Sequence, residues 1–251
     1  MLARCLNKLF ALLLAVTPAA AQTFGGDFVL DGNAQRPQNA TVTLTRGTCV
    51  SDTANATTYN GAGFQATGTG MGETDTYYPV VIAMAEDGQA TFGISSMTIN
   101  GVAATEVIDE DGTGLVDAAL YRGGVEVSGT TINVSVTASE AVTSMVVCAW
   151  GLKNLASFTP LSSVQDDDTA SGALVLTTGT TSASGFVVGA CVAERVADST
   201  TTWAVLTERE DATSAEVDYS NADAAGTGAS MSNTCDWTNT ADASGVAAAF
   251  R

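Results

Sequence analysis

The stretch that decides the fold is Tyr77–Val107, which reads YYPVVIAMAEDGQATFGISSMTINGVAATEV. It contains an apolar run, Val80–Met84, and a second strand-like run, Ile94–Ile99. Asn100-Gly101 follows, and the chain then continues into Val102–Val107. Asn-Gly between two strand-like runs is the strongest short-range hairpin signal, because both residues accept positive φ angles. The stretch therefore predicts β-structure, and it carries no residue pattern of a known chemistry.

The rest of the chain has the same β-character, since Thr, Val, Gly, Ser and Ala dominate it. Thr131–Thr137 alternates apolar and polar residues, as a strand with one buried face does. Thr143–Leu152 and Gly185–Ala193 are apolar on both faces and are expected to be central strands. Together with the intervening turn residues this pattern predicts an all-β, two-sheet sandwich of jelly-roll or Ig-like type over residues 41–251.

The N-terminal residues 1–21 have the pattern of a secretory signal peptide, with Arg4 and Lys8 before an apolar core and a cleavage site at Ala21-Gln22. An alternative is an uncleaved N-terminal docking helix. Residues 22–40 are Gly-rich and polar, and they are expected to form an extended linker. The apolar residues of the docking helix would repeat in a heptad-like row: Leu2, Cys5, Leu9, Leu12 and Val16.

The charge of the chain restricts its partners. There are 9 basic and 27 acidic residues, a net charge of −18, and no histidine. Such a surface repels nucleic acid and anionic lipid, so we expect neither as a partner. No apolar stretch is long enough to span a bilayer as a stable anchor, so we also expect no integral membrane association. The lack of histidine removes Ser-His-Asp and Cys-His catalytic arrangements and all histidine metal sites.

Four cysteines follow the signal-like segment: Cys49, Cys148, Cys191 and Cys235. Cys49 and Cys235 lie near the two ends of the predicted sandwich, which adjoin in many such folds. We therefore predict a Cys49–Cys235 disulfide if the protein is exported. Cys148 and Cys191 lie in the most apolar strands and are expected to be buried thiols. The alternative is that all four cysteines are reduced.

Two acidic segments are candidates for a calcium site. Asp109 and Asp111 resemble the start of a calcium loop, and Asp166 and Asp168 belong to an expected acidic loop. The simpler interpretation is that both are only solvated, so no cofactor is expected beyond this calcium candidate. Glu208, Glu210 and Asp211 cluster on one expected hairpin turn, which is a poor arrangement for a glycosidase pair. We therefore predict no catalytic residue.

Four aromatic residues are candidates for a sugar-binding platform: Trp203, Trp237, Tyr77 and Tyr78. Aromatic faces stack on sugars, but the same rings are equally suited to closing the ends of a sandwich core. The sequence leaves both interpretations open.

Several strand and turn segments follow one another in a familiar order: Val80–Met84, Met97–Thr105 (MTINGVAAT), Ala119–Tyr121, Gly129–Thr137, Val146–Leu152, Gly185–Ala190, Leu206–Asp211 and the closing AAAF strand. This series resembles small β-sandwich virion-associated proteins, tail or decoration components, of proteobacterial phages and prophages. The similarity covers Thr57–Arg251 and implies a virion-surface location without catalytic residues.

The resulting functional expectation is a non-enzymatic structural or attachment protein of a phage-like particle, in a tail, fibre or capsid decoration. It would act through contacts with other structural proteins and as a homo-oligomer. The alternative is an exported bacterial surface adhesin or carbohydrate-binding module that contacts host-surface glycans. A secreted glycoside-active enzyme has little support, because no carboxylate pair stands out.

Overall fold

The structure is a computed structural model of the chain. It describes residues 42–60, 65–69, 76–88, 92–110, 114–129, 131–168, 173–195, 200–214, 216–238 and 242–251. These residues form twenty strands and no helix, which confirms the all-β prediction. They all belong to one compact unit, Arg36–Arg251. The predicted segments 1–21 and 22–40 lie outside the described residues.

The first twelve strands of the chain form one antiparallel sheet in the order β7-β6-β11-β4-β1-β12-β5-β9-β8, to which β2, β3 and β10 add at β12, β11 and β5. The bounds are β1 (Thr43–Gly47), β2 (Val50–Asp52), β3 (Ala56–Tyr59), β4 (Gln65–Thr69), β5 (Thr76–Glu86), β6 (Ile94–Ile99), β7 (Val102–Ala103), β8 (Thr105–Glu110), β9 (Val116–Arg122), β10 (Val127–Ser128), β11 (Thr131–Val142) and β12 (Ser144–Lys153).

The remaining strands form a five-stranded sheet, β13-β20-β15-β18-β17, and a three-stranded sheet, β14-β19-β16. Both sheets are antiparallel. The bounds are β13 (Ser162–Asp168), β14 (Ala173–Thr180), β15 (Phe186–Glu194), β16 (Thr201–Trp203), β17 (Thr207–Ser214), β18 (Val217–Ala225), β19 (Ser230–Trp237) and β20 (Ala243–Phe250).

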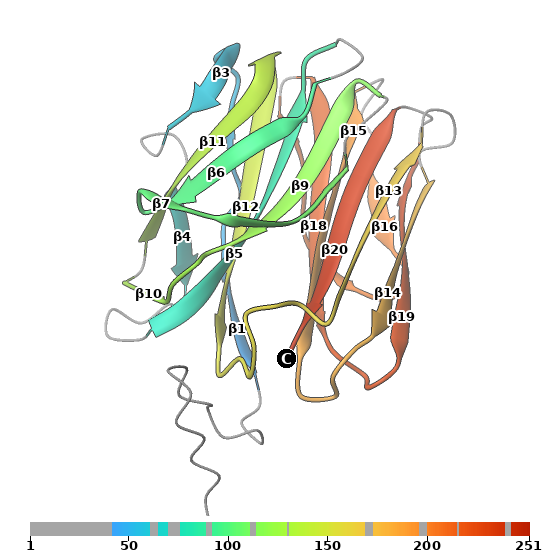
Figure 1. Ribbon diagram of the computed structural model, residues 1–251. Helices are drawn as coiled ribbons and strands as arrows, with labels where there is room; N and C mark the ends of the chain where they lie inside the picture. Colours follow the sequence, from blue (N-terminus) through green and yellow to red (C-terminus); the bar gives the residue numbers. More distant parts are fainter. Residues whose placement is uncertain are drawn as a thin grey trace, which may run out of the picture. The chain divides into compact units, whose positions relative to one another are not determined.

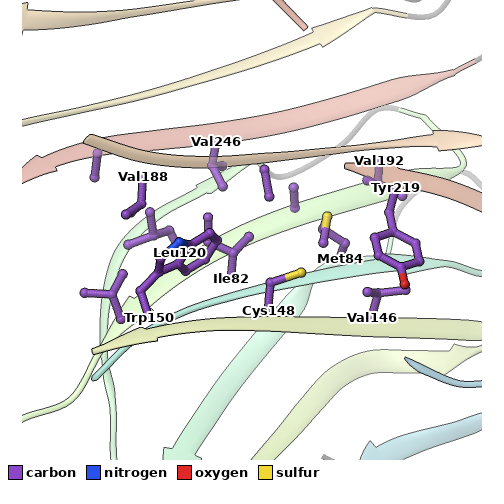
Figure 2. Close-up of a cluster of buried hydrophobic side chains, with 14 of the residues drawn as sticks. Ile82, Met84, Leu120, Val146, Cys148, Trp150, Val188, Val192, Tyr219 and Val246 are labelled. Carbon is purple, nitrogen blue, oxygen red and sulfur yellow. The ribbon is translucent and has the colours of Figure 1, made fainter. Parts of the chain in front are cut away.

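The buried side chains show that the strands stack in four layers, which succeed one another across Figure 1. The large sheet supplies two of them, because it turns back on itself through β4 and β1. One core lies between β3, β6 and β11 on one side and β5, β9 and β12 on the other. A second core separates β5, β9 and β12 from β15, β18 and β20. Figure 2 shows Ile82, Leu120 and Trp150 in this second core, facing Val188 and Val246.

A third core lies between the five-stranded and three-stranded sheets, where Leu174, Trp237 and Met231 pack against β15 and β20. The structure therefore has more sheets than the two that the sequence predicts, although the fold is consistent with a β-sandwich. The physical reason is visible in β5, β12, β15 and β20, whose side chains are buried on both faces. A strand that is apolar on both faces needs a packed layer on each side.

The predicted hairpin is confirmed. β6 pairs with β7 so that Ile99 lies opposite Val102, and Asn100 and Gly101 form the two-residue connection with φ angles of 51° and 77°. The Asn100 side chain accepts a hydrogen bond from the Asn133 backbone N–H at 2.8 Å. This contact ties the turn to β11, the strand that pairs with β6.

Two acidic segments that were expected in loops are strands instead. Asp166, Asp167 and Asp168 belong to β13, which pairs only with β20 and forms an edge of the five-stranded sheet. Glu208, Glu210 and Asp211 lie within β17, at the opposite edge. Charged side chains are suited to edge strands because they discourage pairing with a further strand. High local charge therefore marked the edges of the sheet and not its turns.

Candidate functional site

The most extensive polar arrangement in the described chain lies between the large sheet and the five-stranded sheet. We call it the inter-sheet seam, and it is centred on Asp223 of β18, whose side chain is completely buried. Arg46 of β1 donates to Asp223 through both Nε and Nη2, the latter at 2.6 Å. Arg209 of β17 donates through Nε at 3.1 Å and Nη2 at 2.9 Å. Trp150 of β12 adds its Nε1–H at 3.3 Å.

The donors around Asp223 offset the cost of burying its negative charge. An isolated buried carboxylate costs several kcal/mol, and it is tolerated when paired ions and hydrogen bonds surround it. The hydrogen bond with Asp223 is also the main reason why the pKa of Arg46 rises above its ordinary value. Because Arg46 and Trp150 belong to the large sheet and Asp223 to the five-stranded sheet, the ion pair joins two layers.

The other end of the seam surrounds a disulfide between Cys49 and Cys148. The Asn221 side chain donates to Cys49 Sγ at 2.8 Å and lies 3.6 Å from Cys148 Sγ. Glu210 accepts the Cys49 backbone N–H at 3.1 Å and the Tyr219 hydroxyl at 3.2 Å. Burial first, and then the charge of Glu210, raise the pKa of Tyr219 above its ordinary value. The seam thus consists of Arg46, Cys49, Cys148, Trp150, Arg209, Glu210, Tyr219, Asn221 and Asp223.

The disulfide pairing differs from the predicted one. Cys49 bonds to Cys148, and Cys235 bonds to Cys191, so the expected Cys49–Cys235 bond is wrong and Cys148 and Cys191 are not thiols. Cys49 precedes β2, and β2 pairs with β12 so that Val50 lies opposite Val147, which places Cys49 beside Cys148. Cys191 of β15 faces Cys235 of β19 across the contact between the last two sheets. Strand pairing and layer order decide these distances, and neither follows from distance along the chain.

The four aromatic residues do not form a common platform. Tyr77 is fully buried in the first core, and Trp237 is buried between the five-stranded and three-stranded sheets. Trp203 is partly exposed and donates its Nε1–H to the Ser220 hydroxyl at 2.9 Å. Tyr78 is partly exposed and meets Phe158 edge-on, with 3.7 Å between ring centroids. Tyr77 and Trp237 therefore serve packing and offer no face to a sugar.

The described calcium candidates lie on two neighbouring strands. Asp109 lies in β8, and Asp166 and Asp168 lie in β13, whereas Asp111 is outside the described residues. Asp166 Oδ2 accepts the Val175 backbone N–H at 2.6 Å, which links β13 to β14. Within the described part of the chain, no group of three or more acidic or cysteine side chains has an arrangement that could hold a metal ion.

Neither Asp223 nor a second buried acid, Asp117, was predicted from the sequence. Asp117 of β9 is fully buried, and its Oδ2 accepts the Ile94 backbone N–H at 2.9 Å. The pKa of Asp117 is raised to about 9, mainly by burial and next by the nearby charge of Asp109. Tyr121 on the same strand donates to the Ile94 carbonyl oxygen at 2.9 Å. A single acid in the run VDAALY, which is otherwise apolar and precedes Arg122, was the available signal.

The comparisons with known proteins add no assignment. No family model, curated protein or solved structure matches this chain. Among the described residues, the search for a helix of sufficient length and apolar character to cross a membrane found none.

Proposed function

We propose that this chain is a non-enzymatic structural or attachment protein that acts through protein–protein contacts. The observation that supports this role most directly is the hydrogen bonding of the Asp223 carboxylate. Its buried carboxylate accepts hydrogen bonds from Arg46, Arg209 and Trp150 and thereby joins two sheets. Glu210 likewise binds the Cys49 backbone and Tyr219. The buried Asp223 and the partly buried Glu210 thus both link the large sheet to the five-stranded sheet, which suits a structural β-protein.

The setting that we place first is the surface of a phage-like particle, as a tail, fibre or capsid decoration component that forms homo-oligomers. The support for this setting is the sequence resemblance over Thr57–Arg251. The segments that carry it include the Asn100-Gly101 hairpin and the strand β12, which are packing and turn elements of the fold.

The second setting is the bacterial cell surface, with the protein exported through its N-terminal segment and acting as an adhesin. The two disulfides favour it, because such bonds form and persist in oxidising compartments. A glycan-binding form of this role would need rings other than the buried Tyr77 and Trp237.

Mass spectrometry of native material, purified with its natural assembly, tests the role and the setting together. An intact Met1 in a fraction that sediments with capsid or tail proteins supports the particle component. A terminus at Gln22 on material from the cell surface supports the exported adhesin. The structural role itself fails if the protein turns over a glycoside substrate and loses that activity on a single carboxylate-to-amide change that leaves its melting temperature unchanged.

A further inference from the structure

The two disulfides have different surroundings. Cys191 and Cys235 are both completely buried between two sheets. Cys148 is also buried, with 1% of its surface exposed, but Cys49 is partly exposed at the margin of the second core. Thiol–disulfide exchange requires a thiolate to reach one sulfur of the bond, so access separates the two bonds. Among Cys49, Cys148, Cys191 and Cys235, only Cys49 is partly exposed, and the other three are buried.

We propose that Cys49–Cys148 is a thiol-exchange site that accepts a small thiol at Cys49, whereas Cys191–Cys235 is a permanent link between sheets. The ligand class is a low-molecular-weight thiol of the glutathione type. This inference does not depend on the proposed structural role, since it follows from the surroundings of the sulfurs.

The reaction consists of two successive thiol–disulfide exchange steps. A thiolate attacks Cys49 Sγ, a new S–S bond forms there, and the Cys49–Cys148 bond breaks. Its electron pair leaves on Cys148 as a thiolate, which takes up the proton that the attacking thiol released. A second thiol then attacks the mixed disulfide, and the small thiols leave as their own disulfide. Two small thiols are oxidised while the protein bond is reduced to two cysteine thiols.

Asn221 is positioned to assist this step. Its side chain is buried, and its amide lies within hydrogen-bonding reach of both sulfurs, at 2.8 Å from Cys49 and 3.6 Å from Cys148. A disulfide sulfur is a weak acceptor, whereas an anionic thiolate accepts a charge-assisted hydrogen bond. The amide is therefore better satisfied after the bond opens than before. Glu210 accepts the Cys49 backbone N–H and thereby holds Cys49 in place beside Asn221.

The structure also limits what the opening disturbs. Cys49 lies between β1 and β2, and β2 is a three-residue strand that pairs only with β12. Breaking the bond releases this short strand and leaves the longer pairing of β12 with β5, from Ser144 to Leu152, in place. We therefore expect the native fold to persist in the exchanged form.

The test exposes the native full-length protein to graded concentrations of reduced glutathione, followed by alkylation and peptide mapping. We expect Cys49 and Cys148 to be alkylated, and a glutathionyl group on Cys49, under conditions in which Cys191 and Cys235 remain bonded. Reduction of both bonds at the same rate, reduction of Cys191–Cys235 first, or no reduction short of unfolding would each overturn the proposal.

Two matched variants make the outcome independent of reductant strength. Cys148→Ser leaves Cys49 as a thiol, which we expect to form a mixed disulfide with oxidised glutathione in the native state. Cys49→Ser leaves the buried Cys148, which should not react. Asn221→Leu should slow the reduction of Cys49–Cys148 in the native protein by about tenfold, because a hydrogen bond to a charged sulfur is lost. The rate at which Cys191–Cys235 is reduced in denaturant is the control and should not change. Equal reactivity of the two serine variants contradicts attack at Cys49.

Discussion

Arg46 and Asp223 form an ion pair in which only the carboxylate is fully buried, although 177 residues separate the two in the sequence. Arg46 lies on β1 in the large sheet and Asp223 on β18 in the five-stranded sheet, so the pair connects the half of the chain that forms β1–β12 with the half that forms the other two sheets. Loss of the carboxylate would leave two guanidinium groups facing each other with no anion between them.

Asp223→Asn is therefore expected to lower the free energy of unfolding by about 2–3 kcal/mol. Fully buried ion pairs lose about 3–5 kcal/mol when one partner is removed, and the loss here is smaller because the side chains of Arg46 and Arg209 remain 39% and 31% exposed. Denaturant unfolding measures it. The control is Asp236→Asn, the same change at an exposed site on β19, which should alter stability by less than about 0.5 kcal/mol. An unchanged midpoint for Asp223→Asn would show that the ion pair does not hold the sheets together.

Asp117 predicts a dependence of stability on pH. Its pKa is about 9 in the folded protein against an ordinary value of 3.8, so the folded state holds a proton that the unfolded chain has released in this window. The free energy of unfolding therefore falls as pH rises between these values, by up to about 1.4 kcal/mol per pH unit for one proton.

Asp117→Asn should remove most of that slope and be more stable than the parent at pH 8, because the amide keeps the shape of the carboxyl group without ionising. Denaturant unfolding at pH 5 and pH 8 measures both quantities. Asp236→Asn again serves as the exposed control and should leave the slope unchanged. If Asp117→Asn and the parent show parallel pH profiles, Asp117 is ionised in the folded protein.

Gly101→Ala should destabilise the protein by about 1–2 kcal/mol, the usual range for a left-handed backbone at a residue with a side chain. Gly101 has a φ angle of 77°, and an added Cβ would meet no atom within 4 Å, so the penalty is one of backbone conformation alone. Gly101→Val should cost more, because a β-branched residue resists positive φ. The control is Gly124→Ala, at a glycine without positive φ, which should be close to neutral in thermal melting. Equal melting temperatures for the two alanine variants would mean that the turn tolerates a side chain.

Replacing Cys191 and Cys235 together by alanine should cost about 2–4 kcal/mol, the usual range for a disulfide that closes a loop of tens of residues. The separation here is 44 residues, and the bond joins the five-stranded sheet to the three-stranded sheet. Denaturant unfolding under non-reducing conditions gives the difference. Ser232→Ala, at an exposed position of β19, is the control on the same sheet. A loss no larger than the control would indicate that layer packing alone holds the last sheet.

Much of the local structure could be predicted from the sequence. The Asn100-Gly101 hairpin, the alternation in β11 and the central strands β12 and β15 all follow from periodicity and turn chemistry. Charge is typical of turns, so the sequence predicts loops for the acidic segments. In the structure Asp166 and Glu210 lie partly exposed on the two edge strands of the five-stranded sheet. Charged residues suit edge strands as well as turns, so local charge does not distinguish an edge from a loop.

The sequence by itself determined the β-architecture, because the period of two and the Gly and Asn turn residues act within a few neighbours. Only the tertiary structure decided the four layers, the pairing of Cys49 with Cys148 and of Cys191 with Cys235, and the meeting of Arg46 with Asp223. These depend on which strands become neighbours and which faces stack. The sequence of Tyr77–Val107 predicts that two strands form a hairpin, but the number of sheets that cover them is a property of the whole packed core.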